Sequence, residues 1–238
     1  MTSLASVFQN KKIVFLDMDG TIYLGEKLIP GAEEFLSVLR KKGIKYYYLS
    51  NNSSRSKADY VIKLVHLGIT ASTEEIILST DGVIDFLLGR KIDKTYVVGT
   101  QSMKDMFIHA GIEVDSQNPT YIILGYDIEL NYLKIKTAAL FLQKKIPMLA
   151  THKDLVCPTQ EGLIPDVGAI MALFKKATGK SPEKIFGKPN KEMLDHIIKK
   201  HEVTANDLVI IGDRIYTDME MAYRIGCDFI LVLSGETQ

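Results

Sequence analysis

Apolar and polar residues alternate along the chain in a pattern that predicts strands and helices in turn. Short apolar runs typical of buried strands occur at Ile13–Leu16, Lys45–Leu49, Tyr96–Val98, Tyr121–Leu124, Met148–Ala150, Leu208–Ile211 and Ile230–Leu233. Longer stretches with apolar residues at helical spacing lie between them, at Gly31–Lys42, Lys57–Leu67, Leu133–Gln143, Ala169–Ala177, Lys191–Lys200 and Met219–Ile225. This alternation predicts an α/β fold in which right-handed crossovers join parallel strands.

The residues that follow the predicted strands divide the chain into two parts. Acidic, hydroxyl and amide residues follow the first, second and next-to-last strands, whereas plain glycine turns follow two of the middle strands. We therefore expect a Rossmann-like parallel-sheet core from residues 1–82 and 182–238, and an inserted α/β domain from residues 83–181. The linkers should lie near Ser79–Gly82 and Gly179–Pro182. Ligands of open parallel sheets bind beyond the carboxyl ends of the strands, so the core should carry the site.

The first predicted strand ends in two carboxylates, Asp17 and Asp19, followed by Gly20. Residues two apart on a strand point to the same side, so both acids can face the space beyond the strand. Two like charges at that spacing repel each other, and one pKa rises unless a cation lies between them. The pair therefore indicates either a divalent metal ion or a division of labour between acid and base.

Three further motifs belong to the predicted core. Ser50–Ser53 follows the second strand, where hydroxyl, amide and N–H groups suit an anion. Lys188 immediately precedes a predicted helix, and Gly212–Asp218 is an acidic segment that follows a strand. Each motif alone has a plain structural interpretation, as a solvated turn, a helix cap or a surface lysine. Their occurrence together in one part of the chain favours a catalytic site.

Composition narrows the class of protein. Of the 238 residues, 46% are apolar and 24% are charged, which is typical of a soluble globular chain. Lys+Arg and Asp+Glu both number 29, so no charge excess indicates nucleic-acid binding. No apolar run approaches the roughly 20 residues that cross a membrane. Only Cys157 and Cys227 could form a disulfide, and the first ten residues lack a signal-peptide pattern. We expect a cytoplasmic protein that binds neither nucleic acid nor membranes.

The motifs around Asp17–Thr21, Ser50, Lys188 and Gly212–Asp218 together resemble the four motifs of the haloacid dehalogenase (HAD) superfamily of phosphatases. Further segments are similar to its NagD-like, 4-nitrophenylphosphatase-type branch, namely Leu49–Ser53, Tyr96–Gly99, Ala150–Asp154, Pro158–Ala169 and Gly187–Asn190. Members usually continue past the equivalent of Ser234–Thr237 with one more strand and helix. We therefore expect either a trimmed core or a truncated sequence.

The resemblance implies a phosphatase that depends on Mg²⁺ and hydrolyses a small phosphate monoester, such as a sugar phosphate or a nucleotide. Asp17 would attack phosphorus and form an aspartyl-phosphate, while Asp19 would transfer the protons. Mg²⁺ would bind the carboxylates of Asp17 and Asp213 and the backbone carbonyl of Asp19, with Asp218 acting through a water molecule or from outside the ligand set.

The same resemblance implies that Ser50, Asn51, Asn52 and Lys188 bind the phosphate group. The inserted domain would select the substrate and exclude water when closed. Its His152 is interpreted as a packed or solvent-facing side chain in preference to a substrate ligand. A homo-oligomer is compatible with the sequence.

Three alternatives to hydrolysis use similar motifs. A phosphomutase or phosphotransferase on the same scaffold would return the phosphoryl group to a sugar. A receiver-type signalling module would accept phosphate on Asp17 without catalysis, but receivers lack an acid at the position of Asp19 and need no inserted domain. A silent binding protein would not require all four motifs to be intact. Hydrolysis is therefore the favoured interpretation.

Overall fold

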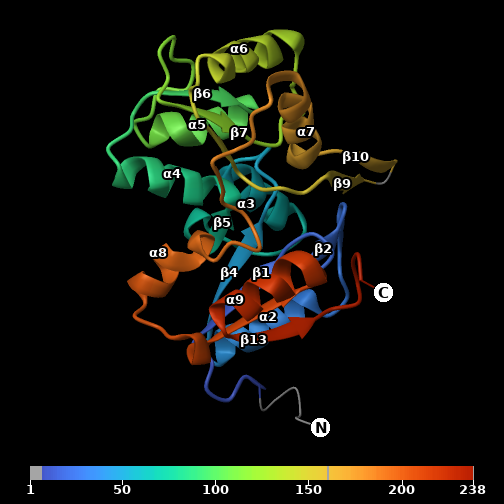
Figure 1. Cartoon of the computed structure of the whole chain (residues 1–238). Coiled ribbons are helices and arrows are strands. Elements are labelled where there is room, and N and C mark those ends of the chain that lie inside the picture. The colour runs from blue at the N-terminus through green and yellow to red at the C-terminus, as the bar shows by residue number, and fades with distance from the viewer. Residues whose placement is uncertain (1–6, 160, 238) are drawn as a thin grey trace. The chain divides into compact units, whose positions relative to one another are not determined.

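The protein is described from a computed structural model, which places residues 7–159 and 161–237. The chain forms two compact units (Figure 1). The first contains the described residues up to Ser50, then Lys57–Ile77, and then the residues from Lys188 onward. The second contains Asn51–Ser56 and Leu78–Gly187. The second unit is therefore inserted into the first in two pieces.

The first unit is built on a five-stranded sheet with the order β13-β12-β1-β4-β5. β1 pairs in parallel with β4 and β12, and β12 pairs in parallel with β13. The strands are β1 (Ile13–Asp17), β4 (Lys45–Ser50), β5 (Ile76–Leu78), β12 (Leu208–Gly212) and β13 (Asp228–Leu231). A short hairpin, β2 (Tyr23–Leu24) and β3 (Lys27–Leu28), follows β1.

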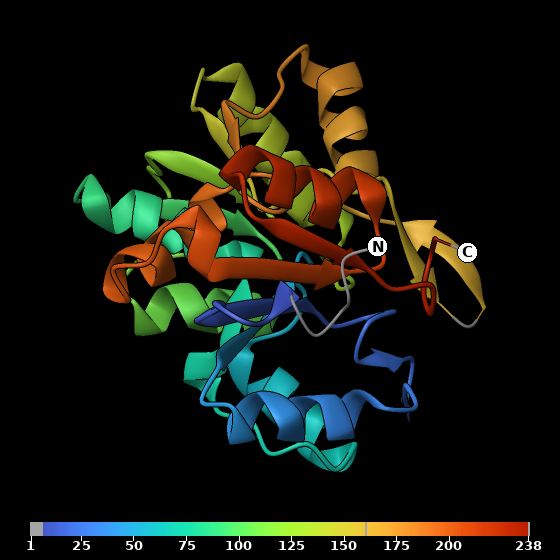
Figure 2. The ribbon, with the colours of Figure 1, turned by 90° about the horizontal axis from the view of Figure 1, so that it is seen from below.

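Helices cover both faces of this sheet. Successive residues of a strand point to opposite sides, and every residue of β1 and β12 is buried, so both faces need cover. Phe15, Leu49 and Ile210 point to one face and pack against residues of α8 and α9. Figure 2 shows α2 and α9 on opposite sides of the strands. The helical elements are α2 (Ala32–Lys41), α3 (Lys57–His66), α8 (Glu192–Lys200), α9 (Glu220–Ile225), the short turns η1 (Thr73–Glu75) and η2 (Ala205–Asp207), and a π-helical turn, η3 (Ile215–Met219).

The second unit has its own parallel sheet with the order β11-β8-β7-β6. Its α6 and α7 pack on one face of this sheet and α4 and α5 on the other (Figure 1). The strands are β6 (Thr95–Val98), β7 (Tyr121–Leu124), β8 (Met148–Ala150) and β11 (Lys184–Ile185), with a separate hairpin of β9 (Val156–Thr159) and β10 (Gly162–Pro165). The helices are α4 (Ser79–Gly89), α5 (Gln101–His109), α6 (Tyr132–Gln143) and α7 (Val167–Thr178).

The predicted fold class, a Rossmann-like parallel-sheet core with an inserted α/β domain, is confirmed. The unit boundaries differ from the predicted 82/83 and 181/182. Ser79–Gly82, expected as a linker, forms the first turn of α4, where the Asp81 carboxylate accepts a hydrogen bond from the Leu78 N–H (2.8 Å). β11 pairs with β8, so the second unit extends to Gly187.

Some elements were not predicted at all. α4 and α5 lie in stretches whose apolar pattern is broken by polar residues and glycine, and Gly82 within α4 packs against the ring of Phe186. β13 begins and ends two residues earlier than predicted. Among the described residues, no helix combines the length and the apolarity needed to cross a membrane.

Candidate active site

The carboxyl ends of three neighbouring strands place polar side chains along one edge of the first unit's sheet. Asp17 ends β1 and is in register with Leu49 of β4, while Leu16 is in register with Ile211 of β12. Ser50 and Asp213 therefore follow the two strands on either side of Asp17. The Ser50 hydroxyl lies 3.2 Å from the hydroxyl of Tyr60. The parallel register explains why residues far apart in the sequence meet here.

Three carboxylates form a buried acidic cluster at this edge. Oxygens of Asp17, Asp213 and Asp218 lie within 4.8 Å of one another, and all three residues are buried. Asp218 comes from η3, which folds back over the end of β12. A Cβ atom at Gly212 would lie 2.6 Å from the Cβ of Asp218, so glycine is what admits this carboxylate.

Lys188 brings a positive charge into contact with this cluster. Its side chain is only 3% exposed, and its ammonium group donates hydrogen bonds to Asp17 and to Oδ1 of Asp218 (2.7 Å for the second). Burial lowers the pKa of Lys188, but the charges of Asp17 and Asp218 outweigh that effect and raise the pKa above its ordinary value. Lys188 is therefore held in its charged form.

One ammonium group does not balance three carboxylates. Burial and then the charge of Asp17 raise the pKa of Asp213, and burial raises the pKa of Asp218 although Lys188 opposes it. Oδ2 of Asp213 accepts a hydrogen bond from the Glu236 N–H (2.6 Å), whereas its buried Oδ1 has no hydrogen-bond partner among the described residues. An uncompensated set of buried carboxylate oxygens fits a hard divalent cation such as Mg²⁺.

Asp19 differs from these three acids because its side chain is exposed. The protein around it nevertheless removes part of the carboxylate's hydration, which raises the pKa of Asp19; Lys63 opposes the rise and Asp17 adds to it. A carboxyl group with a raised pKa suits proton donation. Gly20 then turns the chain at φ +83°, and a Cβ there would lie 2.5 Å from Oδ2 of Asp213.

The predicted phosphate ligands Asn51 and Asn52 belong to the second unit. Nδ2 of Asn51 donates to Oδ2 of Asp154 (3.1 Å). The side-chain oxygen of Asn52 accepts from the N–H (2.9 Å) and the hydroxyl (2.7 Å) of Ser54, which fixes a local turn. His152 is fully buried, which agrees with its interpretation as a packed side chain. Phosphate contacts of the two asparagines stay predictions.

Sequence reasoning missed two features of the site. The first is the π-helical turn that brings the Asp218 carboxylate into the cluster beside Asp213. The expected role of Asp218, through a water molecule or from outside the metal's ligand set, stays a prediction. The segment Ser234–Glu236 also touches the site, through the Ser234 hydroxyl that donates to the Gly20 carbonyl (2.7 Å) and through the Glu236 N–H. The spacing Gly-Asp-x-x-x-x-Asp was the available signal for the first feature, but it does not reveal a π-helical turn.

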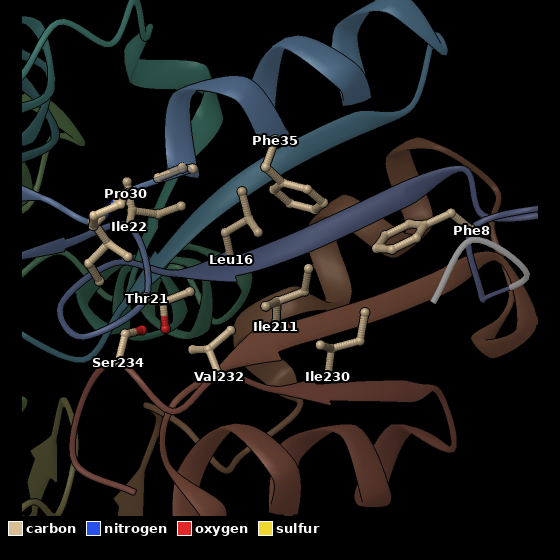
Figure 3. A pocket seen from close by; sticks show the side chains of 13 residues that line it. Phe8, Leu16, Thr21, Ile22, Pro30, Phe35, Ile211, Ile230, Val232 and Ser234 are labelled. Atoms are coloured by element: carbon tan, nitrogen blue, oxygen red, sulfur yellow. The ribbon is translucent and has the colours of Figure 1, made fainter. Parts of the chain in front are cut away.

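A different hollow in the first unit is an apolar pocket of about 220 Å³ (Figure 3). Phe8, Phe35, Leu16 and Ile211 line it, together with other apolar side chains. Thr21 and Ser234 contribute hydroxyl groups, and none of the lining residues is charged. A phosphate dianion would lack a neutralising cation there, so the acidic cluster with Lys188 is the better candidate site.

Family models match most of the chain. Residues 14–113 match the haloacid dehalogenase-like hydrolase model, and residues 185–238 match a second HAD-hydrolase-like model. The first match contains Asp17, Asp19 and Ser50, and the second contains Lys188 and Asp213. The two models thus cover both pieces of chain that supply the acidic cluster.

Whole-chain relatives agree with the models. An acid sugar phosphatase of Staphylococcus haemolyticus is 31% identical over 96% of this chain and 88% of its own length. The crystal structure of a 4-nitrophenylphosphatase from Thermotoga maritima has a TM-score of 0.94 and 37% identity, covering 98% of this chain and 89% of that one. A glycerol phosphate phosphatase from Mycobacterium tuberculosis, solved with magnesium, has a TM-score of 0.89 and 26% identity over 97% of this chain and 70% of that one. The chain therefore belongs to the haloacid dehalogenase-like hydrolases, within the branch of NagD-like and 4-nitrophenylphosphatase-type phosphatases.

Proposed function

We propose that this protein is a Mg²⁺-dependent phosphatase that hydrolyses small phosphate monoesters through an aspartyl-phosphate on Asp17. The observation that carries the proposal is the convergence of Asp17, Lys188 and Asp213 in one buried cluster. The magnesium in the structure of the glycerol phosphate phosphatase supports the choice of metal.

Mg²⁺ would be held by the carboxylates of Asp17 and Asp213 and the backbone carbonyl of Asp19, and Asp218 would hold Lys188 in place. When bound, the ion supplies positive charge that offsets the repulsion between a carboxylate and a phosphate dianion. Lys188 supplies a further positive charge beside Asp17. This compensation matters because uncatalysed phosphate-monoester hydrolysis is among the slowest biological reactions.

The first half of the reaction transfers the phosphoryl group to the protein. A carboxylate oxygen of Asp17 attacks phosphorus in line, so that the Asp17 O–P bond forms as the ester P–O bond breaks. Asp19, in its protonated form, donates its proton to the leaving oxygen; its raised pKa favours that form. The alcohol then departs.

The second half returns the protein to its starting state. Asp19 is now a carboxylate and removes a proton from a water molecule. That water attacks phosphorus, the bond from phosphorus to Asp17 breaks, and inorganic phosphate leaves. Asp19 thus acts as acid and then as base, which leaves both residues ready for another turnover.

Phosphate recognition would use further polar groups of the chain. The Ser50 hydroxyl, the Asn51 backbone N–H, the Asn52 side chain and the Lys188 ammonium group would bind phosphoryl oxygens. The second unit would select the alcohol part of the substrate. Relatives named as acid sugar phosphatase, 5′-nucleotidase and glycerol phosphate phosphatase support a small, polar phosphate ester.

An assay of phosphate release tests the proposal directly. Purified protein would be given 4-nitrophenyl phosphate, glycerol phosphate, a sugar phosphate and a nucleoside monophosphate, each with Mg²⁺ and with a chelator. We expect turnover that requires Mg²⁺. Absence of turnover on all four esters would refute the proposal, and transfer of the phosphoryl group to a sugar in place of water would replace it with a phosphomutase.

Replacement of Asp19 by Asn is expected to lower kcat by at least about 10²-fold on glycerol phosphate, because the leaving alkoxide loses its proton donor. The loss in the first step should be smaller with 4-nitrophenyl phosphate, whose leaving group departs without a proton. Rapid-mixing measurements of 4-nitrophenol release would separate that step from hydrolysis of the intermediate. The control is Asp195→Asn, an exposed carboxylate on α8. An equal loss in the first step with both esters would contradict the role of acid.

A further inference from the structure

Two residues of the second unit are joined directly to predicted phosphate ligands of the first. The boundary between the units falls between Ser50 and Asn51 and again between Gly187 and Lys188. Asn51 is therefore the first residue of the second unit after Ser50, and Gly187 is its last residue before Lys188. Whatever fixes these two residues also constrains the peptide planes next to the phosphate ligands.

One loop of the second unit, residues 151–154, contacts both of them. The Asn51 side chain donates to Oδ2 of Asp154 (3.1 Å), and the Gly187 N–H donates to the carbonyl of Thr151 (2.5 Å). A Cβ at Gly187 would lie 2.5 Å from Oδ1 of Asn51 and 2.8 Å from the Cβ of His152. Asn51, Gly187 and the loop therefore form one closely packed group.

The carbonyl of Asn51 is held as well, by the Ser79 hydroxyl (2.7 Å) at the start of α4. Both the side chain and the peptide of Asn51 thus have defined partners within the second unit. Fixing the side chain and the peptide that follows Asn51 limits rotation about its backbone bonds and so helps to preorganise the preceding peptide, which carries the Asn51 N–H.

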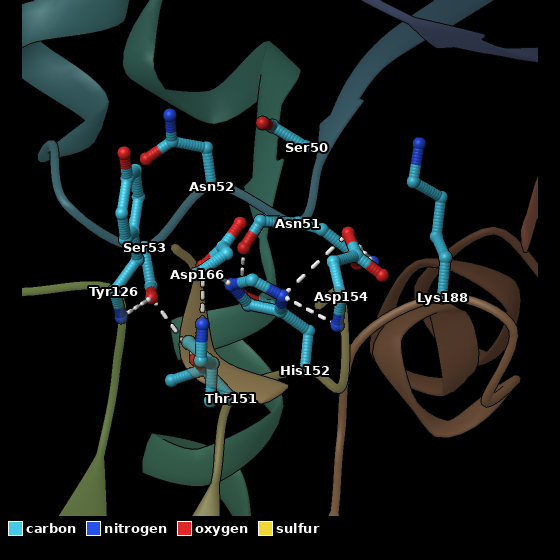
Figure 4. Close-up of polar contacts among 12 residues, drawn as sticks. Ser50, Asn51, Asn52, Ser53, Tyr126, Thr151, His152, Asp154, Asp166 and Lys188 are labelled. Atoms are coloured by element: carbon cyan, nitrogen blue, oxygen red, sulfur yellow. Dashed lines mark hydrogen bonds and ion pairs between the residues drawn. The ribbon is translucent and has the colours of Figure 1, made fainter. Parts of the chain in front are cut away.

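The buried ring of His152 contacts this loop and Asp166 (Figure 4), and we call this set of contacts the brace. The ring is fully buried, with Nδ1 3.5 Å from Oδ2 of Asp154 and Nε2 3.5 Å from Oδ1 of Asp166. The Asp154 N–H donates to Nδ1 (3.4 Å). Asp166 also caps α7, since its Oδ1 accepts from the Val167 N–H (2.6 Å). The imidazole therefore connects the loop to the end of a helix.

Asp154 faces one ring nitrogen of His152 and Asp166 faces the other. Because Nδ1 accepts from the Asp154 N–H, the ring N–H of a neutral His152 is at Nε2, on the side of Asp166. One ligand atom of each of the three residues lies within 4.8 Å of the other two. The contacts of the ring connect the loop to α7 without requiring a metal ion.

We propose that His152 and Asp154 are positioning residues for phosphate binding, which act by holding Asn51 and Gly187 and, through them, the peptide bonds to Ser50 and Lys188. This inference rests on the proposed function. Neither residue needs to touch the substrate. Because every substrate carries the same phosphoryl group, loss of the brace affects all of them alike.

The experiment compares Asp154→Ala with the wild-type protein. We expect inhibition by inorganic phosphate to weaken by about 10-fold or more and kcat/KM to fall by about 10- to 10²-fold, by a similar factor for 4-nitrophenyl phosphate, glycerol phosphate and a nucleoside monophosphate. Asp154→Asn retains a side-chain oxygen that can accept from Asn51, and it should recover part of the loss. His152→Ala should resemble Asp154→Ala.

Asp127→Ala is the matched control. Asp127 is another buried carboxylate of the second unit, paired with Lys134 (2.8 Å) and not bonded to residues 151–154. The Asp127→Ala variant should have a lower melting temperature, because it leaves the mostly buried charge of Lys134 without that carboxylate. Its inhibition by inorganic phosphate should be unchanged. If Asp154→Ala does not fold, Asn51→Ala tests the same link, because it deletes the side chain that Asp154 holds and keeps the backbone N–H.

Two results would overturn the inference. One is unchanged phosphate inhibition in a folded Asp154→Ala protein, and the other is a changed order of preference among the substrates, which would mean that Asp154 contacts the alcohol part. Both differ from failure of the proposed function, in which the wild-type protein itself shows no Mg²⁺-dependent turnover.

Discussion

Replacement of Asp17 by Asn is expected to abolish phosphate release, lowering kcat by about 10⁴-fold or more. An amide oxygen is a much weaker nucleophile than a carboxylate oxygen, and no aspartyl-phosphate can form on it. The fold should survive, because Asn has nearly the same shape and its side-chain oxygen can still accept the hydrogen bond from Lys188. Loss of activity would therefore report the chemistry rather than unfolding.

The measurement is release of 4-nitrophenol in the presence of Mg²⁺, together with mass spectrometry of protein quenched during turnover. Wild-type protein should carry one phosphoryl group on the peptide that contains Asp17, and the Asn variant should carry none. Asp228→Asn serves as the control, since Asp228 is an exposed carboxylate that pairs with Lys11 at the surface. Turnover of the Asp17 variant within 10-fold of wild type would exclude Asp17 as the nucleophile.

Removal of the metal ion is expected to eliminate activity and also to lower the melting temperature. An ion that binds only the folded state stabilises it by about 2.7 kcal/mol at a concentration 100 times its dissociation constant. The stabilisation should depend on Asp213, whose buried Oδ1 has no hydrogen-bond partner among the residues that the structure places. Asp213→Asn should therefore lose most of the effect of Mg²⁺ on the melting temperature.

Without metal, we expect the Asp213→Asn substitution to have the opposite effect on stability. Asp213→Asn removes one of three clustered negative charges, so in a chelator it should melt at a higher temperature than the wild-type protein. Calorimetry of both proteins, with MgCl₂ and with a chelator, gives the four melting temperatures required. An equal Mg²⁺-induced shift in the two proteins would mean that the ion binds elsewhere.

The main features of the site could be predicted from the sequence because they depend on parallel strands. Apolar runs locate β1, β4 and β12, and the carboxyl ends of adjacent parallel strands share one edge. That argument alone places Asp17, Ser50 and Asp213 near one another. The position of Lys188 could not be obtained in this way, since it follows a two-residue strand of the other unit's sheet, and only the resemblance to known motifs indicated it.

What could not be predicted depended on tertiary contacts. The assignment of residues 51–56 to the second unit follows from side-chain hydrogen bonds, which leave no periodic pattern in a sequence. The hydrogen-bond partners of residues 51–56 in the rest of the second unit lie between 28 and 103 residues away along the chain. The glycine that interrupts the apolar pattern of α4, Gly82, lies against the ring of Phe186, a contact that the sequence pattern does not reveal.

The insertion of the second unit in two pieces constrains how the protein can be re-engineered. Ser53 and Ser54, in the short piece, accept or donate hydrogen bonds with Thr151 (2.9 Å) and Thr100 (2.7 Å) in the long piece. In a chimera that takes only residues 78–187 from another phosphatase, the short piece, Asn51–Ser56, would lose these hydrogen-bond partners. Transplanting specificity would therefore require both segments to be exchanged as a set.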